Sequence, residues 1–300
     1  MLDAREFVLF VNILWSPRLK MASSWHDSLL SNTTTCAYVA LSPDGKRMAL
    51  VLEGSSFDVW VYDLERGTFT RASFGGDDYR PAFSPDGRLL AYDSSKSGAQ
   101  QVFLKHGIAQ GEDTALTEGP EDKALQGLTA DAREVIFARH NKDTGWDLYA
   151  AAVVGDHKPR PLVVAPFNQT QAAVSPDGKW LAYVSDESGQ PEVFVQGMKD
   201  PGMRAQISSE GGSAPRWSRS SNELLFLSKN RVMSVKVGTG SGLAPGKPVA
   251  LFEDKKEWSG YDIAPDGPLV VTREADSNGS GSQINVVTGW FERLKQQQRK

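Results

Sequence analysis

The chain has 300 residues, of which 40% are apolar and 23% charged, a composition typical of a globular protein. With 33 Lys and Arg against 37 Asp and Glu, its net charge is −4, which argues against nucleic acid and anionic membrane surfaces as partners. The single cysteine, Cys36, excludes an intrachain disulfide framework and a multi-cysteine zinc site. This length allows one large domain or two ordinary ones.

The first 36 residues contain the longest apolar stretch, residues 7–15. It is nine residues long and includes an asparagine, whereas a membrane-spanning helix needs about 20 apolar residues. Asp3 and Glu6 offset Arg5, and no small-residue cleavage site follows, so the pattern is also a poor signal peptide. We therefore predict no membrane span in this chain.

From residue 37 onwards the sequence repeats itself about every 44 residues. Each repeat contains a Ser-Pro-Asp-Gly motif or a worn copy of it. Asp-Gly is a strong signal for a tight turn between two strands. The six copies begin at Ser42, Ser84, Thr129, Ser175, Ser218 and Ala264.

Short apolar runs surround each motif and are separated by turn residues. In the fourth repeat they cover residues 173–174, 180–184, 192–195 and 204–208. Runs of this length that are rich in Val, Phe, Tyr and Trp are typical of β-strands. Four strands per repeat and six repeats predict an all-β fold, a six-bladed β-propeller of four-stranded antiparallel blades over residues 37–300, because radial packing buries the faces of the sheets.

The end of the chain bears on how this ring closes. A full sixth repeat would end near residue 308 at about the observed period, whereas the chain ends at 300, and residues 290–295 favour a short C-terminal helix. We therefore expect the sixth blade to lack an outer strand. Residues 1–36 form an atypical N-terminal segment that can supply a closing strand, and residues 7–14 are its most strand-like part.

Several segments resemble a known family, the six-bladed propellers of the TolB group, also described as WD-repeat-like. The similarity is closest to the C-terminal propeller of certain bacterial serine/threonine protein kinases and covers about residues 37–294. No kinase motif accompanies it, so kinase activity is not implied. The matching segments are residues 58–67, 158–162, 175–184, 215–219, 284–287 and 290–292.

The resemblance implies a non-catalytic binding or sensor module, part of a bacterial signalling protein, with a protein or peptide partner. A monomer is expected, extracytoplasmic (periplasmic) if the chain belongs to a membrane-anchored kinase and cytoplasmic otherwise. An accessory propeller of a prolyl-oligopeptidase-like hydrolase is the alternative. A propeller enzyme with a metal in its channel is a third reading, but Asp78 and Asp262 are too few ligands for it.

No catalytic constellation is visible: the chain has neither a nucleophile elbow nor a His-Glu-x-x-His pair. We therefore predict that it is not an enzyme and binds no metal or cofactor. The repeated aspartates are interpreted as turn residues, since Asp accepts backbone hydrogen bonds and Gly supplies positive φ. These turn pairs are Asp44 and Gly45, Asp86 and Gly87, Asp177 and Gly178, and Asp266 and Gly267.

A propeller usually binds its ligand at one end of the ring, where loops lead into the innermost strands. In this sequence those loops combine Tyr, Trp, Arg, Asn and Gly, and Tyr, Trp and Arg are enriched at binding surfaces. By position alone, we predict the ligand or partner surface to include Tyr79, Arg80, Gln171, Arg216 and Tyr261.

Overall fold

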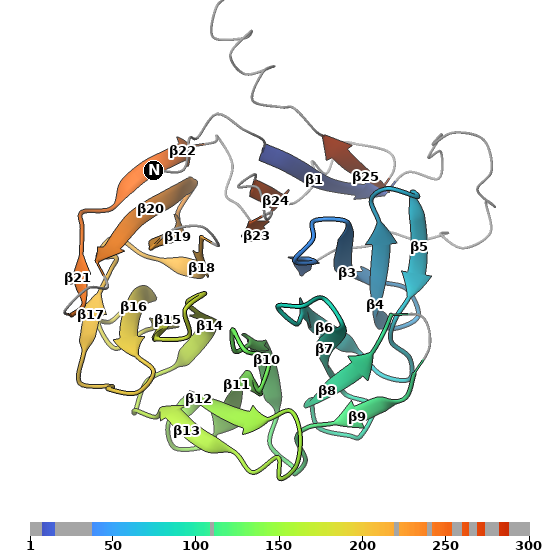
Figure 1. Ribbon diagram of the computed structural model, residues 1–300, viewed down its shortest axis with the longest axis horizontal. Coiled ribbons are helices and arrows are strands. Elements are labelled where there is room, and N and C mark those ends of the chain that lie inside the picture. The colour runs from blue at the N-terminus through green and yellow to red at the C-terminus, as the bar shows by residue number, and fades with distance from the viewer. Residues whose placement is uncertain are drawn as a thin grey trace, which may run out of the picture.

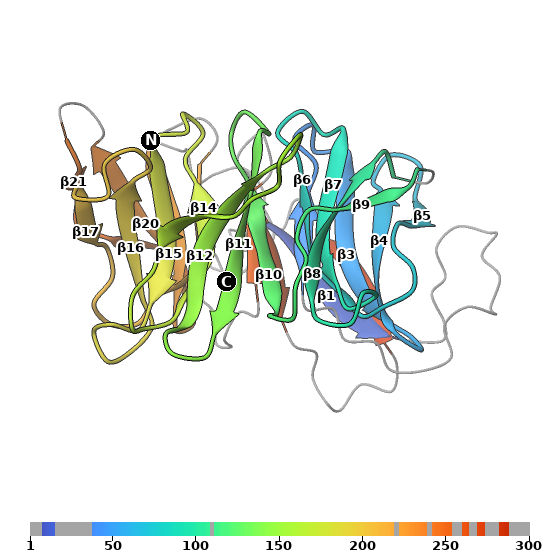
Figure 2. The ribbon, with the colours of Figure 1, turned by 90° about the horizontal axis from the view of Figure 1, so that it is seen from below.

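The computed structural model describes residues 8–15, 38–108, 111–218, 222–238, 242–253, 260–263, 269–273 and 282–287. All regular elements in these ranges are β-strands, and they form six sheets around a common axis (Figure 1). Seen from the side, the strands run between the two flat faces of the ring (Figure 2). The helix expected at residues 290–295 lies outside the described residues.

Five sheets are antiparallel throughout and follow one another along the chain; we call them blades 1 to 5. Blade 1 contains β2 (Val39–Leu41), β3 (Arg47–Glu53), β4 (Phe57–Asp63) and β5 (Thr68–Arg71). Blade 2 contains β6 (Asp78–Phe83), β7 (Leu89–Ser94), β8 (Gln101–His106) and β9 (Asp113–Ala115). Blade 3 contains β10 (Lys123–Leu128), β11 (Glu134–Asn141), β12 (Gly145–Ala152) and β13 (Arg160–Val163).

The remaining blades complete the antiparallel series. Blade 4 contains β14 (Gln169–Val174), β15 (Trp180–Ser185), β16 (Glu192–Gly197) and β17 (Arg204–Gln206). Blade 5 contains β18 (Ser213–Trp217), β19 (Glu223–Ser228), β20 (Arg231–Gly238), β21 (Ala244–Pro245) and β22 (Val249–Glu253). Both β21 and β22 pair with β20, so this blade has five strands.

The sixth sheet joins the two ends of the chain. It contains β23 (Gly260–Ile263), β24 (Leu269–Arg273), β1 (Val8–Trp15) and β25 (Ser282–Val287), in this order. β1 runs parallel to β24 and antiparallel to β25. In Figure 1 this sheet lies between blade 5 and blade 1.

The prediction of six antiparallel blades is therefore wrong for this last sheet, and the described residues form five antiparallel blades. A hairpin forces neighbouring strands to be antiparallel, but β1 reaches β24 from the opposite end of the chain, without a hairpin, and can run parallel to it. The expectation that this sheet lacks its own outer strand is also wrong, because β25 forms the outer edge and β1 lies inside it.

The apolar core lies between adjacent blades. Each junction between two of the five blades is filled by alternate side chains of the facing strands, as the period-2 pattern of the strands requires. A cross-strand aromatic pair also recurs between the second and third strands of blades 2, 3 and 4, with ring centroids about 6 Å apart. These pairs are Tyr92 with Phe103, Phe137 with Tyr149, and Tyr183 with Phe194.

The Ser-Pro-Asp-Gly motifs form the turns that join the inner strand of a blade to its second strand. In blade 2 the Ser84 hydroxyl donates to Asp86 Oδ1 (2.5 Å), and the backbone N–H of Arg88 donates to the same oxygen (3.0 Å). These two donors hold the pKa of Asp86 below its usual value. Equivalent bonds form around Asp44 and Asp177, and the glycines Gly45, Gly87 and Gly178 all have φ near 70°. Asp266 and Gly267 lie outside the described residues.

Blade 3 tests this turn chemistry, because Thr129 and Asp131 form the same network but Ala132 occupies the glycine position at φ 57°. We expect Ala132→Gly to raise the free energy of unfolding by about 0.5–1 kcal/mol, since glycine relieves the left-handed strain. Gly178→Ala, whose added Cβ meets nothing within 4 Å, is expected to lower it by a similar amount. Urea unfolding measures both, and a destabilised Ala132→Gly variant would contradict the expectation.

Candidate functional site

The two faces of the ring differ in what they carry. The loops that lead from the outer strand of one blade into the inner strand of the next open on one face, here called the loop face. The Ser-Pro-Asp-Gly turns lie on the opposite face, the turn face, because each inner strand runs from its loop to its turn (Figure 2). All five side chains predicted to bind a ligand belong to inner strands.

Inner strands of blades 2, 4 and 5 are interrupted near the loop face. Their pairing with the second strand shifts register, and the shifts include Arg80, Gln171 and Ala214. These three residues have positive φ values of 50°, 53° and 49°. Such bulges re-aim side chains, and strained backbone of this kind clusters at binding and catalytic sites. Two of the predicted site residues, Arg80 and Gln171, thus occupy equivalent bulged positions.

Arg80 is held by a fully buried carboxylate. Its Nη1 donates to Asp93 Oδ2 (2.8 Å), the same oxygen accepts from Gln100 Nε2 (3.0 Å), and Asp93 Oδ1 accepts from the backbone N–H of Leu125 in blade 3 (3.1 Å). Burial raises the pKa of Asp93 to about 6, although the Arg80 guanidinium pulls it down. The arginine side chain keeps about a third of its surface exposed, so it remains accessible from solvent.

Gln171 connects blades 4 and 5, because its Oε1 accepts a hydrogen bond from the backbone N–H of Ala214 (2.5 Å). Gln126 braces blade 3 against blade 4 through the N–H of Ala172 (3.0 Å). Asp262 Oδ2 accepts from the N–H of Leu41 (2.7 Å) and so connects the sixth sheet to blade 1. Polar side chains of inner strands therefore tie neighbouring sheets together around the axis of the ring.

The other three predicted residues differ in accessibility. Tyr79 is half-buried and packs against Tyr38 and Phe57 at the junction of blades 1 and 2. Arg216 is half-buried, and its Nη1 donates to the carbonyl oxygen of Pro215 (2.9 Å). Tyr261 is only 2% exposed, so the expectation that its side chain lies on a binding surface is wrong. Its burial between sheets, which raises the pKa of its hydroxyl, could not be read from the loop around it.

The loop face carries exposed apolar side chains that the sequence did not single out. Phe74 is 52% exposed in the loop between blades 1 and 2, and Val164 (50%) and Phe167 (40%) are exposed between blades 3 and 4. The Arg71 guanidinium lies 4.6 Å from the centre of the Phe74 ring. Their exposure could have been predicted from the sequence, because an apolar residue inside a turn-rich segment has no strand face on which to be buried.

Metal ligands and membrane spans can be assessed only for the described part of the chain. There, no group of three or more His, Cys, Asp or Glu side chains is placed to hold a metal ion. The two aspartates considered as metal ligands lie in different surroundings. Asp78 is fully buried in blade 2, and Asp262 accepts a hydrogen bond from the backbone N–H of Leu41. Within the same residues no helix has the length and apolar character needed to cross a membrane.

Comparisons with known proteins agree on the architecture. No protein-family model matches the chain. The Tol-Pal system protein TolB of Bordetella pertussis is 25% identical over 155 residues, which are 51% of this chain and 35% of that protein. The chain thus spans about a third of the length of this curated relative.

Solved structures extend the likeness to most of the ring. A putative TolB from Agrobacterium tumefaciens has a TM-score of 0.64 at 17% identity, covering 86% of this chain and 92% of that one. TolB from Acinetobacter baumannii has a TM-score of 0.60 at 19% identity, covering 82% and 59%. A prolyl endopeptidase reaches 0.51 at 15% identity, covering 87% and 43%. The chain therefore has the fold of a TolB-like β-propeller.

Proposed function

We propose that this chain is a non-catalytic binding module whose loop face docks a protein partner. The observation that carries the proposal is the exposure of Phe74, Val164 and Phe167 on loops between blades. An exposed aromatic side chain beside a partly exposed arginine, here Phe74 beside Arg71, matches the residue types that dominate protein interfaces.

The relatives narrow the choice of partner to test. Because the Bordetella pertussis relative is named as a protein of the Tol-Pal system, we propose the other Tol-Pal system proteins of the source organism as the first partners. A partner of this kind would cover the loop face and contact the inner-strand bulges at Arg80 and Gln171.

Calorimetric titration of these purified proteins tests the proposal with a matched pair of variants. Phe74→Ser combined with Phe167→Ser is expected to weaken binding at least about tenfold, because each aromatic side chain loses its apolar contact with the partner. The control, Val154→Ser with Met203→Ser, changes two exposed apolar residues on the turn face and is expected to leave binding unchanged. Equal losses in both variants, or binding that neither variant affects, would refute the loop face as the docking surface.

The sequence also suggested two more specific associations, one with a protein kinase and one with a prolyl-oligopeptidase-like hydrolase. None of the relatives reported above is a kinase, so the kinase association and the signalling function derived from it gain no support from them. The hydrolase alternative rests on fold likeness to a prolyl endopeptidase, of which the chain covers 43%. Reading the coding sequence on both sides of this chain distinguishes them, because each requires a further catalytic domain.

A further inference from the structure

In blades 1, 2 and 4, one repeated position fills the groove between that blade and the next on the turn face. It lies five residues after the start of the motif and is occupied by Arg47, Leu89 and Trp180 in blades 1, 2 and 4. Leu89 packs in the same apolar cluster as Leu128, and Trp180 in the same cluster as Trp217. Leu89 and Trp180 thus each share an apolar cluster with the last inner-strand residue of the next blade.

Arg47 shows how a cation fills this groove. Its Nη2 donates to the carbonyl oxygen of Gly87 in blade 2 (3.1 Å), and its guanidinium lies 5.5 Å from the centre of the Phe83 ring. Asp44, in the turn of its own blade, is 3.9 Å from the same nitrogen. The groove between blades 1 and 2 thus supplies a carbonyl, a carboxylate and an apolar wall to an arginine side chain.

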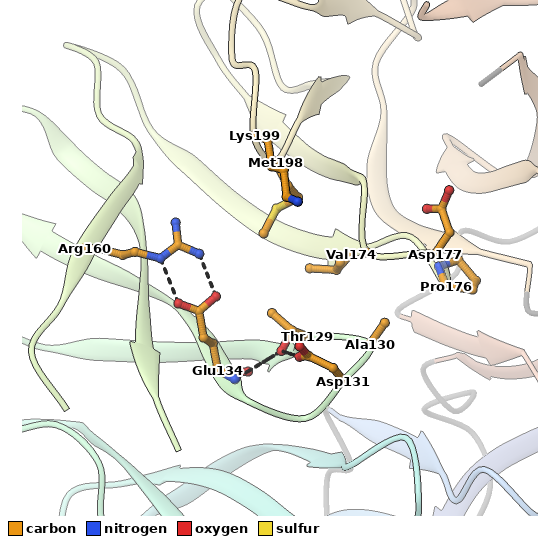
Figure 3. Close-up of a pocket in the computed structure, with 11 residues that line it drawn as sticks. Thr129, Ala130, Asp131, Glu134, Arg160, Val174, Pro176, Asp177, Met198 and Lys199 are labelled. Atoms are coloured by element: carbon orange, nitrogen blue, oxygen red, sulfur yellow. Dashed lines mark hydrogen bonds and ion pairs between the residues drawn. The ribbon is translucent and has the colours of Figure 1, made fainter. Parts of the chain in front are cut away.

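Between blades 3 and 4 this position is occupied by Glu134, which lines the groove but does not fill it. Glu134 accepts from Arg160 Nε (2.7 Å) and Nη2 (2.6 Å) of the outer strand of its own blade. Val174, with a smaller side chain, stands where blade 2 has Phe83 and blade 5 has Trp217. A cavity of ≈ 520 Å³ remains beside the ion pair. Figure 3 shows the residues that line it. Its size falls within the range of small-ligand sites.

The lining of this cavity repeats the surroundings of Arg47. Asp131 corresponds to Asp44 and Gly178 to Gly87, and Val174 and Met198 supply an apolar wall. Asp177 from the turn of blade 4 adds a second carboxylate. Glu134 and Arg160 neutralise each other, and each aspartate faces one exposed cation of its own turn, Arg133 at 3.7 Å from Asp131 and Lys179 at 3.5 Å from Asp177. Both partner cations are exposed, so an arginine side chain in the cavity can compete with them for the carboxylates while its aliphatic stem contacts the apolar wall.

We propose that the cavity between blades 3 and 4 binds the arginine side chain of a partner peptide, in the position that Arg47 occupies between blades 1 and 2. The guanidinium would donate to the Gly178 carbonyl and meet Asp131 and Asp177, while its methylene stem would contact Val174 and Met198. This site lies on the turn face and does not depend on the proposed docking at the loop face.

A titration with small blocked amino acids tests the chemistry. Nα-acetyl-arginine N-methylamide is added to protein carrying ¹³C-methyl methionine, and the Met198 methyl signal is followed by NMR, with exposed Met203 as the internal reference. We expect a saturable shift of Met198 alone, and binding at least about fivefold weaker for the uncharged citrulline and norleucine analogues. Equal binding of citrulline, or no saturable shift with the arginine compound, would overturn the proposal.

Paired variants separate recognition from turn stability. Asp177→Asn and Asp86→Asn remove a charge from equivalent turns, but only Asp177 lines the cavity. Asp177→Asn is expected to weaken binding of the arginine compound about threefold to fivefold, and Asp86→Asn to leave it unchanged. Equal effects of the two variants would count against the site. Binding should persist in the Phe74→Ser, Phe167→Ser double variant, so its loss there would also contradict a separate site on the turn face.

Discussion

Replacement of Trp217 by alanine is expected to lower the free energy of unfolding by about 3–5 kcal/mol. Trp217 is 7% exposed and belongs to the apolar cluster between blades 4 and 5, together with Trp180. Its Nε1 also donates to the carbonyl oxygen of Ala173 in the inner strand of blade 4 (3.1 Å). The truncation therefore leaves a cavity between two blades and removes a hydrogen bond that joins their inner strands.

Urea unfolding followed by circular dichroism measures this effect, and two further variants separate its parts. Trp217→Phe keeps an aromatic ring but loses the N–H donor, so we expect a smaller loss, about 1–2 kcal/mol. Trp146→Ala truncates a tryptophan that is only half-buried and is expected to cost less than Trp217→Ala. A loss below about 1 kcal/mol for Trp217→Ala would show that the junction of blades 4 and 5 does not depend on this side chain.

Asp93→Ala is expected to lower the free energy of unfolding by about 3–5 kcal/mol at pH 7, because it leaves a partly buried guanidinium without its partner. The Leu125 N–H in blade 3 and the Arg80 guanidinium in blade 2 lose their acceptor in the same substitution. Asp93→Asn retains one carbonyl oxygen and is expected to cost less. A small effect of Asp93→Ala would mean that Arg80 is not fixed by this network.

The same carboxyl predicts a pH dependence. Its pKa is raised from 3.8 to about 6 in the folded chain, so between about pH 4 and 6 the folded state holds a proton that the unfolded state has lost. Stability contributed by this group therefore decreases as pH rises through that window, by at most about 1.4 kcal/mol per pH unit. Unfolding at pH 4.5 and 7 should show a larger difference between wild type and Asp93→Ala at pH 4.5. A difference that does not change with pH would contradict the raised pKa.

Much of the architecture follows from local chemistry in the sequence. The spacing of the Ser-Pro-Asp-Gly turns, with Asp86 accepting backbone hydrogen bonds and Gly87 at positive φ, predicts where strands of one blade meet. The apolar alternation of the runs predicts which side chains enter the core, as the burial of Trp180 shows. These features depend on residues close together in the chain, so a single sequence contains enough information to predict them.

The tertiary structure alone decided the features that depend on distant segments. β1 pairs with β24 and β25 across almost the whole length of the chain, and no turn dictates its direction. Tyr261 is buried while Phe74 is exposed, since exposure depends on what the neighbouring sheet places opposite each side chain. Glu134 leaves a cavity because Arg160 of the same blade holds it back, whereas Arg47 at the corresponding position crosses to the next blade. The repeat determines the backbone position of a residue. The residues that packing brings near it determine the direction of its side chain.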